Sequence, residues 1–205
     1  MNRRRHQPMG AVLAGGRGRR LGGDKAVVML AGRPLIAYPL AALRAVVPDV
    51  MIVAKPDTAL PAGDELRAVR VLREPAEPRH PLVGILHALR VAAGRPVLVC
   101  AADLPFLTAE VLRELVQTDP GDAPAVVATG ADGAMQPLLG CYRPEAGPLL
   151  EAAAREAAAP VRSAVAAIGA QRLEVSADVL FNVNSREDLA RAEELLAGLY
   201  PNVKS

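Results

Sequence analysis

Short apolar runs alternate along the chain with stretches in which apolar residues recur at helical spacing. Three runs are almost continuously apolar, at residues 9–13, 50–54 and 97–101. Such runs are typical of strands buried on both faces of a parallel sheet. Residues 69–72 form a weaker run of this kind. Residues 81–93 carry apolar positions at helical spacing and end before Gly94, a common helix stop. This order predicts repeated strand, helix, strand crossovers.

A further helix is expected over residues 34–47, because Pro34 suits the first helical position. Pro39 lies inside this segment and should cost it a hydrogen bond or kink it. Residues 27–30, just before it, are expected to form a short extended piece.

The second half of the chain is less regular. Its expected extended segments are residues 125–128, 138–142, 173–175 and 181–184, and its expected helices are residues 108–117, 146–159, 161–168 and 185–197. A glycine-containing turn at 129–133 predicts a hairpin, and Ser185 with Asp188 predicts a capping box. The whole pattern predicts an α/β fold, a three-layer α/β/α sandwich around a mostly parallel, Rossmann-like sheet. Ligands of such sheets bind at the carboxyl ends of the strands.

Composition narrows the class of protein. With 205 residues, 51% hydrophobic and 22% charged, the chain is expected to form a single domain over residues 9–200 after a disordered basic tail at 1–8. The net charge of +2 and the aromatic share of 2% argue against a nucleic-acid partner. We expect small-molecule ligands.

The two cysteines bear on location. Cys100 and Cys141 lie in apolar, strand-like runs without a CxxC or His-rich spacing, so we expect buried thiols of a reducing compartment. The apolar run at 9–14 is too short for a signal peptide, and no segment has the length of a membrane span. We therefore predict a cytoplasmic protein that has no membrane partner.

The stretch after the first strand is rich in glycine and cations. Its glycines include Gly15, Gly16 and Gly18, and its cations are Arg17, Arg19, Arg20 and Lys25. Glycines let successive backbone N–H groups point into one concavity, and cations offset the charge of a triphosphate. The third glycine of a dinucleotide fingerprint is replaced by Leu21, and the Ser/Thr of a P-loop by Ala26. The loop predicts a nucleoside-triphosphate site; a tight connection with solvated arginines is the alternative.

Asp103 is the second marker. It lies just past the strand at 97–101, at the sheet edge where the glycine loop also begins. A carboxylate beside a phosphate cradle would repel the ligand unless a cation lies between them, and Mg²⁺ is the cation implied. The alternative role is that of a turn residue before the helix that Thr108 caps. Its pairing with the loop favours the metal.

Several motifs occur in an order known from one family. They are the LAGG and RLGGDK pieces within 13–25, GRPL at 32–35, PLVGI at 81–85, CAADLPF at 100–106, QPL at 136–138 and FNVNSREDL at 181–189. Together they resemble the molybdenum cofactor guanylyltransferases, the MobA family of the nucleotidyltransferase superfamily, which has a nucleotide-diphospho-sugar transferase-like fold. The likeness extends from about residue 9 to residue 195.

This resemblance implies a reaction and a set of site residues. GMP passes from GTP to the terminal phosphate of molybdenum-bearing molybdopterin, pyrophosphate leaves and Mg²⁺ is required. Cofactor-accepting molybdoenzymes or their chaperones are the implied protein partners. The implied nucleotide contacts are Leu13, Ala14, Gly15, Gly16, Lys25, Glu74 and Asp103, of which Asp103 also binds the metal. The implied catalytic residues are Lys25, Asp103 and Arg19, and the implied pterin-side residues are Gln136, Pro137, Asn182 and Asn184.

The nucleophile determines what catalysis needs. A phosphate monoester has its second pKa near ~6 and is largely ionised at neutral pH. Attack on the α-phosphorus then needs charge neutralisation and in-line placement rather than a general base. The lack of an obvious Ser/His/Asp or Cys/His set is expected for such a reaction.

The sequence departs from the family pattern at three places. Val53 stands where the family often has Asn, Glu74 where it has Asp, and His80 where it has Gly. The first two touch expected base and ribose contacts, so a molybdopterin cytidylyltransferase or another small-molecule phosphate nucleotidyltransferase remains an alternative. A nucleotide-binding module without turnover is a third reading, opposed by the presence of Lys25 and Asp103.

Overall fold

The computed structural model describes most of the chain. The described residues are 7–16, 19–21, 23, 25–63, 66–67, 69–157 and 160–199, without the side chains of residues 19, 156, 157 and 199. Residues 1–6 of the predicted tail at 1–8 lie outside them. So do Arg17 and Gly18 of the glycine loop and the side chain of Arg19.

A seven-stranded sheet forms the centre, in the order β5-β4-β1-β6-β8-β7-β9. Its strands are β1 (Met9–Leu13), β4 (Val50–Ala54), β5 (Arg70–Arg73), β6 (Val97–Ala101), β7 (Ala125–Thr129), β8 (Met135–Tyr142) and β9 (Gln171–Glu174). All neighbours pair in parallel except β8, which is antiparallel to β6 and β7. The mostly parallel sheet is therefore confirmed. Leu13 is level with Val53 on β4 and with Ala101 on β6, so three strands end together.

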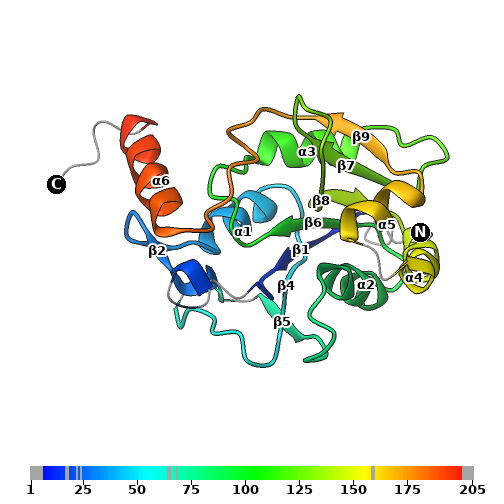
Figure 1. Ribbon diagram of the computed structural model, residues 1–205, viewed down its shortest axis with the longest axis horizontal. Coiled ribbons are helices and arrows are strands. Elements are labelled where there is room, and N and C mark those ends of the chain that lie inside the picture. Colours follow the sequence, from blue (N-terminus) through cyan, green and yellow to red (C-terminus); the bar gives the residue numbers. More distant parts are fainter. Residues whose placement is uncertain are drawn as a thin grey trace.

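Helices cover both faces of this sheet (Figure 1). They are α1 (Ala37–Arg44), α2 (Pro81–Ala92), α3 (Ala109–Gln117), α4 (Ala146–Ala157), α5 (Val161–Ala167) and α6 (Arg186–Leu199). Because side chains alternate along a strand, Val12 packs in the core under α1 and α3, while Ala11 packs in the core under α2, α4 and α5. This arrangement confirms the three-layer sandwich. A third apolar cluster joins α6 to the hairpin of β2 (Met29–Leu30) and β3 (Arg33–Pro34).

The predicted helix at 34–47 was wrong at its start. Pro34 pairs with Met29 in the small β2–β3 hairpin, and the helix begins only at Ala37. Pro39 therefore lies in the first turn, where backbone N–H groups have no acceptor within the helix. The lost hydrogen bond that we expected does not arise. Residues 25–27 form a 3-10 turn, so only the second half of the piece at 27–30 is extended.

Other boundaries differ by a few residues. Strand β8 begins at Met135, three positions earlier than expected, and so includes Gln136 and Pro137. The pairing of β7 with β8 shifts register between Val127 and Thr129, opposite the part of β8 that contains Pro137. Proline in a strand often occurs at such a bulge. The capping box is confirmed, because the Asp188 N–H donates to Ser185 Oγ at 3.1 Å and the Ser185 N–H donates to Asp188 Oδ2 at 2.9 Å. Within the described chain, no helix combines the length and apolar character needed to cross a bilayer.

Candidate active site

Two loops meet at the carboxyl ends of β1 and β6. The Lys25 ammonium donates to Asp103 Oδ2 at 2.8 Å and also to Asn184 Oδ1. The side chains of Lys25 and Asp103 are 18% and 16% exposed, so the pair is largely enclosed but open to a ligand. The level ends of the two strands make this contact possible across 78 positions of sequence. The predicted meeting of the glycine loop with Asp103 is therefore observed.

One oxygen of the Asp103 carboxylate has no hydrogen-bond partner among the described residues. Its Oδ1 atom is buried and forms no hydrogen bond with any described residue. Its backbone carbonyl accepts from the Val183 N–H at 3.0 Å, which ties the end of β6 to the segment before α6. A buried carboxylate oxygen without a partner is costly unless a ligand or ion completes it. No three His, Cys, Asp or Glu side chains form a metal-binding group among the described residues.

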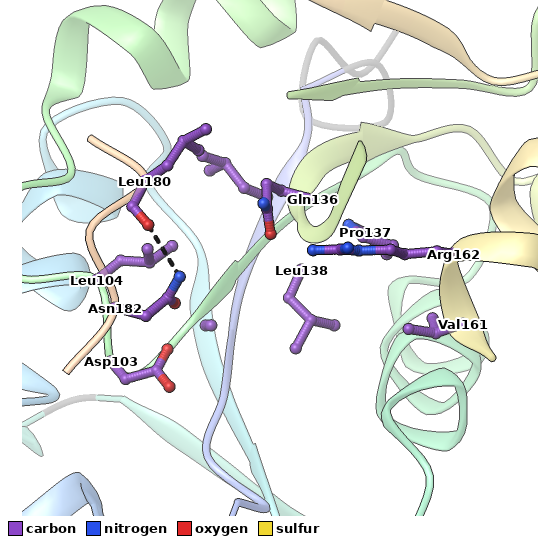
Figure 2. Close-up of a pocket in the computed structure, with 11 residues that line it drawn as sticks. Asp103, Leu104, Gln136, Pro137, Leu138, Val161, Arg162, Leu180 and Asn182 are labelled. Carbon is purple, nitrogen blue, oxygen red and sulfur yellow. Dashed lines mark hydrogen bonds between the residues drawn. The ribbon is translucent and has the colours of Figure 1, made fainter. Parts of the chain in front are cut away.

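Asn184 and Asn182 have different surroundings. The backbone N–H of Asn184 donates to Asp188 Oδ2 at 2.9 Å, which fixes the segment against the start of α6. This N–H, together with the Ser185 hydroxyl, holds the pKa of the Asp188 carboxyl below its usual range. Asn184 thus contacts Lys25, whereas Asn182 lines a cavity and donates from Nδ2 to the Leu180 carbonyl at 2.9 Å (Figure 2).

A cavity of about 330 Å³ lies on the glycine-loop side. Its lining includes Leu13, Gly15, Gly16, Lys55, Glu74 and His80. A Cβ atom at Gly15 would lie 3.0 Å from Glu74 Oε1, closer than most real contacts, so a larger residue here would press against the Glu74 carboxylate. Ala14 is buried, and its N–H donates to the Val53 carbonyl at 2.8 Å, which prolongs the sheet beyond β1.

Lys55 and Glu74 form a buried ion pair in the wall of this cavity. Their side chains are only 2% and 6% exposed, and Lys55 Nζ lies 3.5 Å from Glu74 Oε1. The same ammonium donates to the carbonyls of Pro75 at 2.7 Å and Pro78 at 2.9 Å. Glu74 Oε2 is buried and unpartnered among the described residues. Burial raises the pKa of the Glu74 carboxyl, and the Lys55 ammonium opposes that rise.

Sequence reasoning missed Lys55. The side chain of Val53, two positions earlier, is buried in the core under α2, whereas Lys55 is the first residue past β4, at the edge where ligands of such sheets bind. A lysine directly after a wholly apolar strand was the available signal. His80 caps the N-terminus of α2, because its Nδ1 accepts a hydrogen bond from the Leu82 N–H at 3.3 Å.

A second cavity, of about 200 Å³, includes Asp103 itself. Leu138 lines both cavities and stands between them. Figure 2 shows Gln136, Pro137 and Asn182 around the second cavity with Asp103. These predicted pterin-side residues are therefore gathered at one place. Arg162, which also lines the cavity, was missed, since nothing in the sequence separates it from other helix arginines. Arg20, one of the loop cations, is exposed.

Comparisons with known proteins agree with this geometry. The profile of the MobA-like NTP transferase domain matches residues 10–175. A molybdenum cofactor guanylyltransferase of Cereibacter sphaeroides is 38% identical over 192 residues, which cover 91% of this chain and 96% of that protein.

Solved structures share the fold. A molybdopterin-guanine dinucleotide biosynthesis protein A from Archaeoglobus fulgidus is 26% identical, with a TM-score of 0.70 and coverage of 93% of this chain and 99% of that chain. A 2-C-methyl-D-erythritol 4-phosphate cytidylyltransferase from Thermus thermophilus is 20% identical, with a TM-score of 0.65 and coverage of 92% and 98% of the two chains, and shows the fold alone. The profile match and the identity to the Cereibacter protein, set beside the loop and carboxylate described above, show that the chain belongs to the MobA-like NTP transferase family.

Proposed function

We propose that this protein is a Mg²⁺-dependent transferase that moves GMP from GTP to the terminal phosphate of molybdenum-bearing molybdopterin and releases pyrophosphate. The observation that carries the proposal is the Lys25–Asp103 pair. It connects the glycine loop to the smaller cavity, whose lining includes Asp103. The substrates are those in the names of relatives that are similar to this chain over most of its length.

The larger cavity would hold the nucleoside. Gly15 and Gly16 line this cavity and belong to the glycine loop. The triphosphate would therefore bind beside the backbone N–H groups of the loop and the Lys25 ammonium. The unpartnered Glu74 Oε2 is an acceptor inside the protein. Guanine offers adjacent N–H donors at N1 and N2, which a carboxylate accepts. Glu74 therefore supports guanine as the base, although it replaces the Asp that the family often has.

Asp103 fits a magnesium site. Its Oδ1 atom is a buried carboxylate oxygen without a partner in the described structure, which is the ligand type that Mg²⁺ prefers. Because no group of three protein ligands surrounds it among the described residues, phosphate oxygens and water would supply the remaining ligands. When bound, the ion would supply charge neutralisation at the phosphates of GTP.

The chain's own residues would neutralise charge and position the substrates. The Lys25 ammonium stands 2.8 Å from Asp103 and can donate to phosphate oxygens brought beside it. The loop amides, with Arg19 as the expected loop cation, would hold the departing pyrophosphate. An oxygen of the acceptor phosphate forms the new bond to the α-phosphorus of GTP, and the bond to the bridging oxygen breaks with its electron pair on pyrophosphate. The acceptor phosphate is already ionised, so no protein base is required.

The cavity linings agree with a direct transfer. None of the described residues that line either cavity is a Ser, Thr or Cys, so no hydroxyl or thiol nucleophile faces the substrates there. Burial raises the pKa of the Cys141 thiol to about 11, which keeps it protonated and unreactive. Two buried free thiols also support the cytoplasmic location that we propose.

The test is pyrophosphate release from GTP, CTP and ATP in the presence of Mg²⁺ and molybdenum-loaded molybdopterin. We expect release from GTP to exceed the others, and equal release from CTP would refute the guanylyl assignment. Asp103→Asn should lower turnover by about 10²–10³-fold, the usual cost of losing one charge-stabilising group. Circular dichroism and the melting temperature of this variant should match the wild type. Unchanged turnover would remove Asp103 from the metal site.

A further inference from the structure

Few side chains in the larger cavity can donate a hydrogen bond to a ligand. Among the described residues that line it, the donors are the side chains of Lys55, Arg79 and His80. The three N–H groups of the Lys55 ammonium are matched by the Glu74 carboxylate and by two backbone carbonyls. The Arg79 guanidinium pairs with two carboxylates, at 2.6 and 3.4 Å. His80 is the donor whose commitments leave room for a ligand.

The cap of α2 decides which nitrogen of His80 donates. Nδ1 accepts from the Leu82 N–H at 3.3 Å, so it carries no proton. In a neutral imidazole one nitrogen is an acceptor and the other a donor. The proton is therefore on Nε2. The bond to Leu82 is the one hydrogen bond that the His80 side chain forms with the described part of the chain, so Nε2–H has no partner there.

A buried acceptor lies at the same end of α2. A Cβ atom at Gly84 would lie 3.5 Å from Glu74 Oε2, the carboxylate oxygen that is buried and unpartnered among the described residues. His80 precedes Gly84 by four positions, and side chains four apart at a helix lie about 5–6 Å from one another between Cβ atoms. The cavity thus offers one free donor and one free acceptor oxygen about one helical turn apart.

This pair of groups matches the polar edge of guanine. Guanine presents the acceptor O6 next to the donors N1–H and N2–H. One carboxylate oxygen has two lone pairs and can accept from both donors, which leaves O6 to be matched by a donor. Cytosine presents two acceptors, N3 and O2, beside a single amino group, so a carboxylate would face an acceptor. One donor beside a carboxylate therefore favours guanine.

We propose that His80 donates from Nε2 to O6 of guanine and, together with Glu74, determines the preference for GTP. The inference rests on the proposed function and names a further specificity-determining residue for it. The family often has glycine where this chain has His80, so the contact comes from a side chain that the family pattern lacks. A site that hydrogen-bonds one atom of its substrate discriminates strongly against analogues that lack this atom.

Equilibrium binding of nucleotides, measured by titration calorimetry with Mg²⁺ and without the acceptor, tests this with a readout independent of turnover. The probes are GTP, 6-thio-GTP and ITP. In 6-thio-GTP a sulfur, which is a weak acceptor, replaces O6, and ITP lacks the 2-amino group. The wild type should bind each analogue about 10-fold more weakly than GTP, the usual loss when one partner of a hydrogen bond is removed.

His80→Ser separates the base contact from the helix cap. Serine is a favoured N-cap whose hydroxyl can accept from the Leu82 N–H, but it is too short to reach the base. The melting temperature should therefore stay that of the wild type. The Kd of GTP should rise about 10-fold, whereas the Kd of 6-thio-GTP should change by less than about twofold. The ratio between ITP and GTP should persist, because Glu74 reads the amino group independently.

His80→Gly introduces the residue that the family often has and should give the same pattern. Glycine is also tolerated at an N-cap, so this variant keeps the test valid if the serine variant is unstable. It has no side chain, so any remaining discrimination against 6-thio-GTP would come from another group.

The outcomes separate this inference from the proposed function. If the wild type prefers GTP to CTP, but the His80 variants keep the wild-type ratio between 6-thio-GTP and GTP, then His80 does not donate to O6 and the inference is overturned. An equal loss of affinity for all three probes also overturns it, since His80 would then contact the ribose or the phosphates. A wild type that binds CTP as tightly as GTP contradicts the proposed guanylyl transfer itself. Loss of the O6 preference in the variants, with the amino-group preference retained, supports the inference.

Discussion

Replacing Lys55 with methionine tests how the wall of the larger cavity, where we propose that the nucleotide binds, is held. Methionine keeps an apolar stem of similar length and removes only the ammonium. In the wild type that ammonium joins three groups, namely Glu74 Oε1 at 3.5 Å and the carbonyls of Pro75 and Pro78 at 2.7 and 2.9 Å. All three lose this partner in the variant. The β5–α2 connection and the Glu74 carboxylate are then no longer tied together.

The expected cost is large because the pair is buried. Lys55 is 2% exposed, so solvent screens its contacts little. Breaking a buried ion pair by removing one partner costs about 3–5 kcal/mol of unfolding free energy. In a domain of this size that corresponds to a fall in melting temperature of roughly 6–20 °C, at about 2–4 °C per kcal/mol. The KM for GTP should rise as well, because Glu74 would lose its position.

The pH dependence has a definite sign. Burial raises the folded-state pKa of Glu74 above its ordinary value of 4.5, so the protonated carboxyl favours folding at low pH and that contribution is lost as pH rises through the folded pKa. Without the Lys55 ammonium the folded pKa rises further. The stability difference between wild type and variant should therefore be smallest below pH 4.5 and should grow above it.

Urea unfolding of both proteins at about pH 5 and about pH 8 measures this difference. Glu74→Gln is the control, since it keeps the side-chain shape and removes the titrating group. At the higher pH the double variant, Lys55→Met with Glu74→Gln, should be more stable than Lys55→Met alone. A deficit that is equal at the two pH values, or one below about 1 kcal/mol as at exposed pairs, would refute the picture of a buried, coupled pair.

Three further substitutions address other parts of the site. Lys25→Met should weaken GTP binding by about 10–100-fold, as expected for losing a charged hydrogen bond to phosphate, with little change in melting temperature; equal losses in both would indicate a structural lysine. Gly15→Ala places a Cβ atom 3.0 Å from Glu74 Oε1 and should raise the KM for GTP more than it lowers stability, and an unchanged KM would show that the carboxylate moves freely. Ser185→Ala removes the cap of α6 and should cost about 1 kcal/mol by thermal unfolding, whereas no loss would mean that the Asp188 bond is sufficient.

The sequence alone determined the central sheet and its ligand-binding edge. Continuously apolar runs at 9–13, 50–54 and 97–101 can be buried on both faces only between layers of helices, so the sandwich follows from local composition. Because adjacent parallel strands end level, the residues after the first and third of these runs had to come together. The proximity of the glycine loop to Asp103 was predictable for that reason, whereas the direct bond from Lys25 to Asp103 was seen only in the structure.

Tertiary structure decided the features that depend on distant partners. The pairing of Pro34 with Met29 determines where α1 begins. The buried ammonium of Lys55 is held by the carbonyls of Pro75 and Pro78, which lie 20 and 23 positions away in the sequence. The placement of Arg162 beside the smaller cavity likewise depends on how α5 packs against β8. Periodicity and propensity describe a residue's near neighbours along the chain. Which charge is buried and which faces a ligand depends on contacts between segments far apart in sequence, and these exist only in the folded protein.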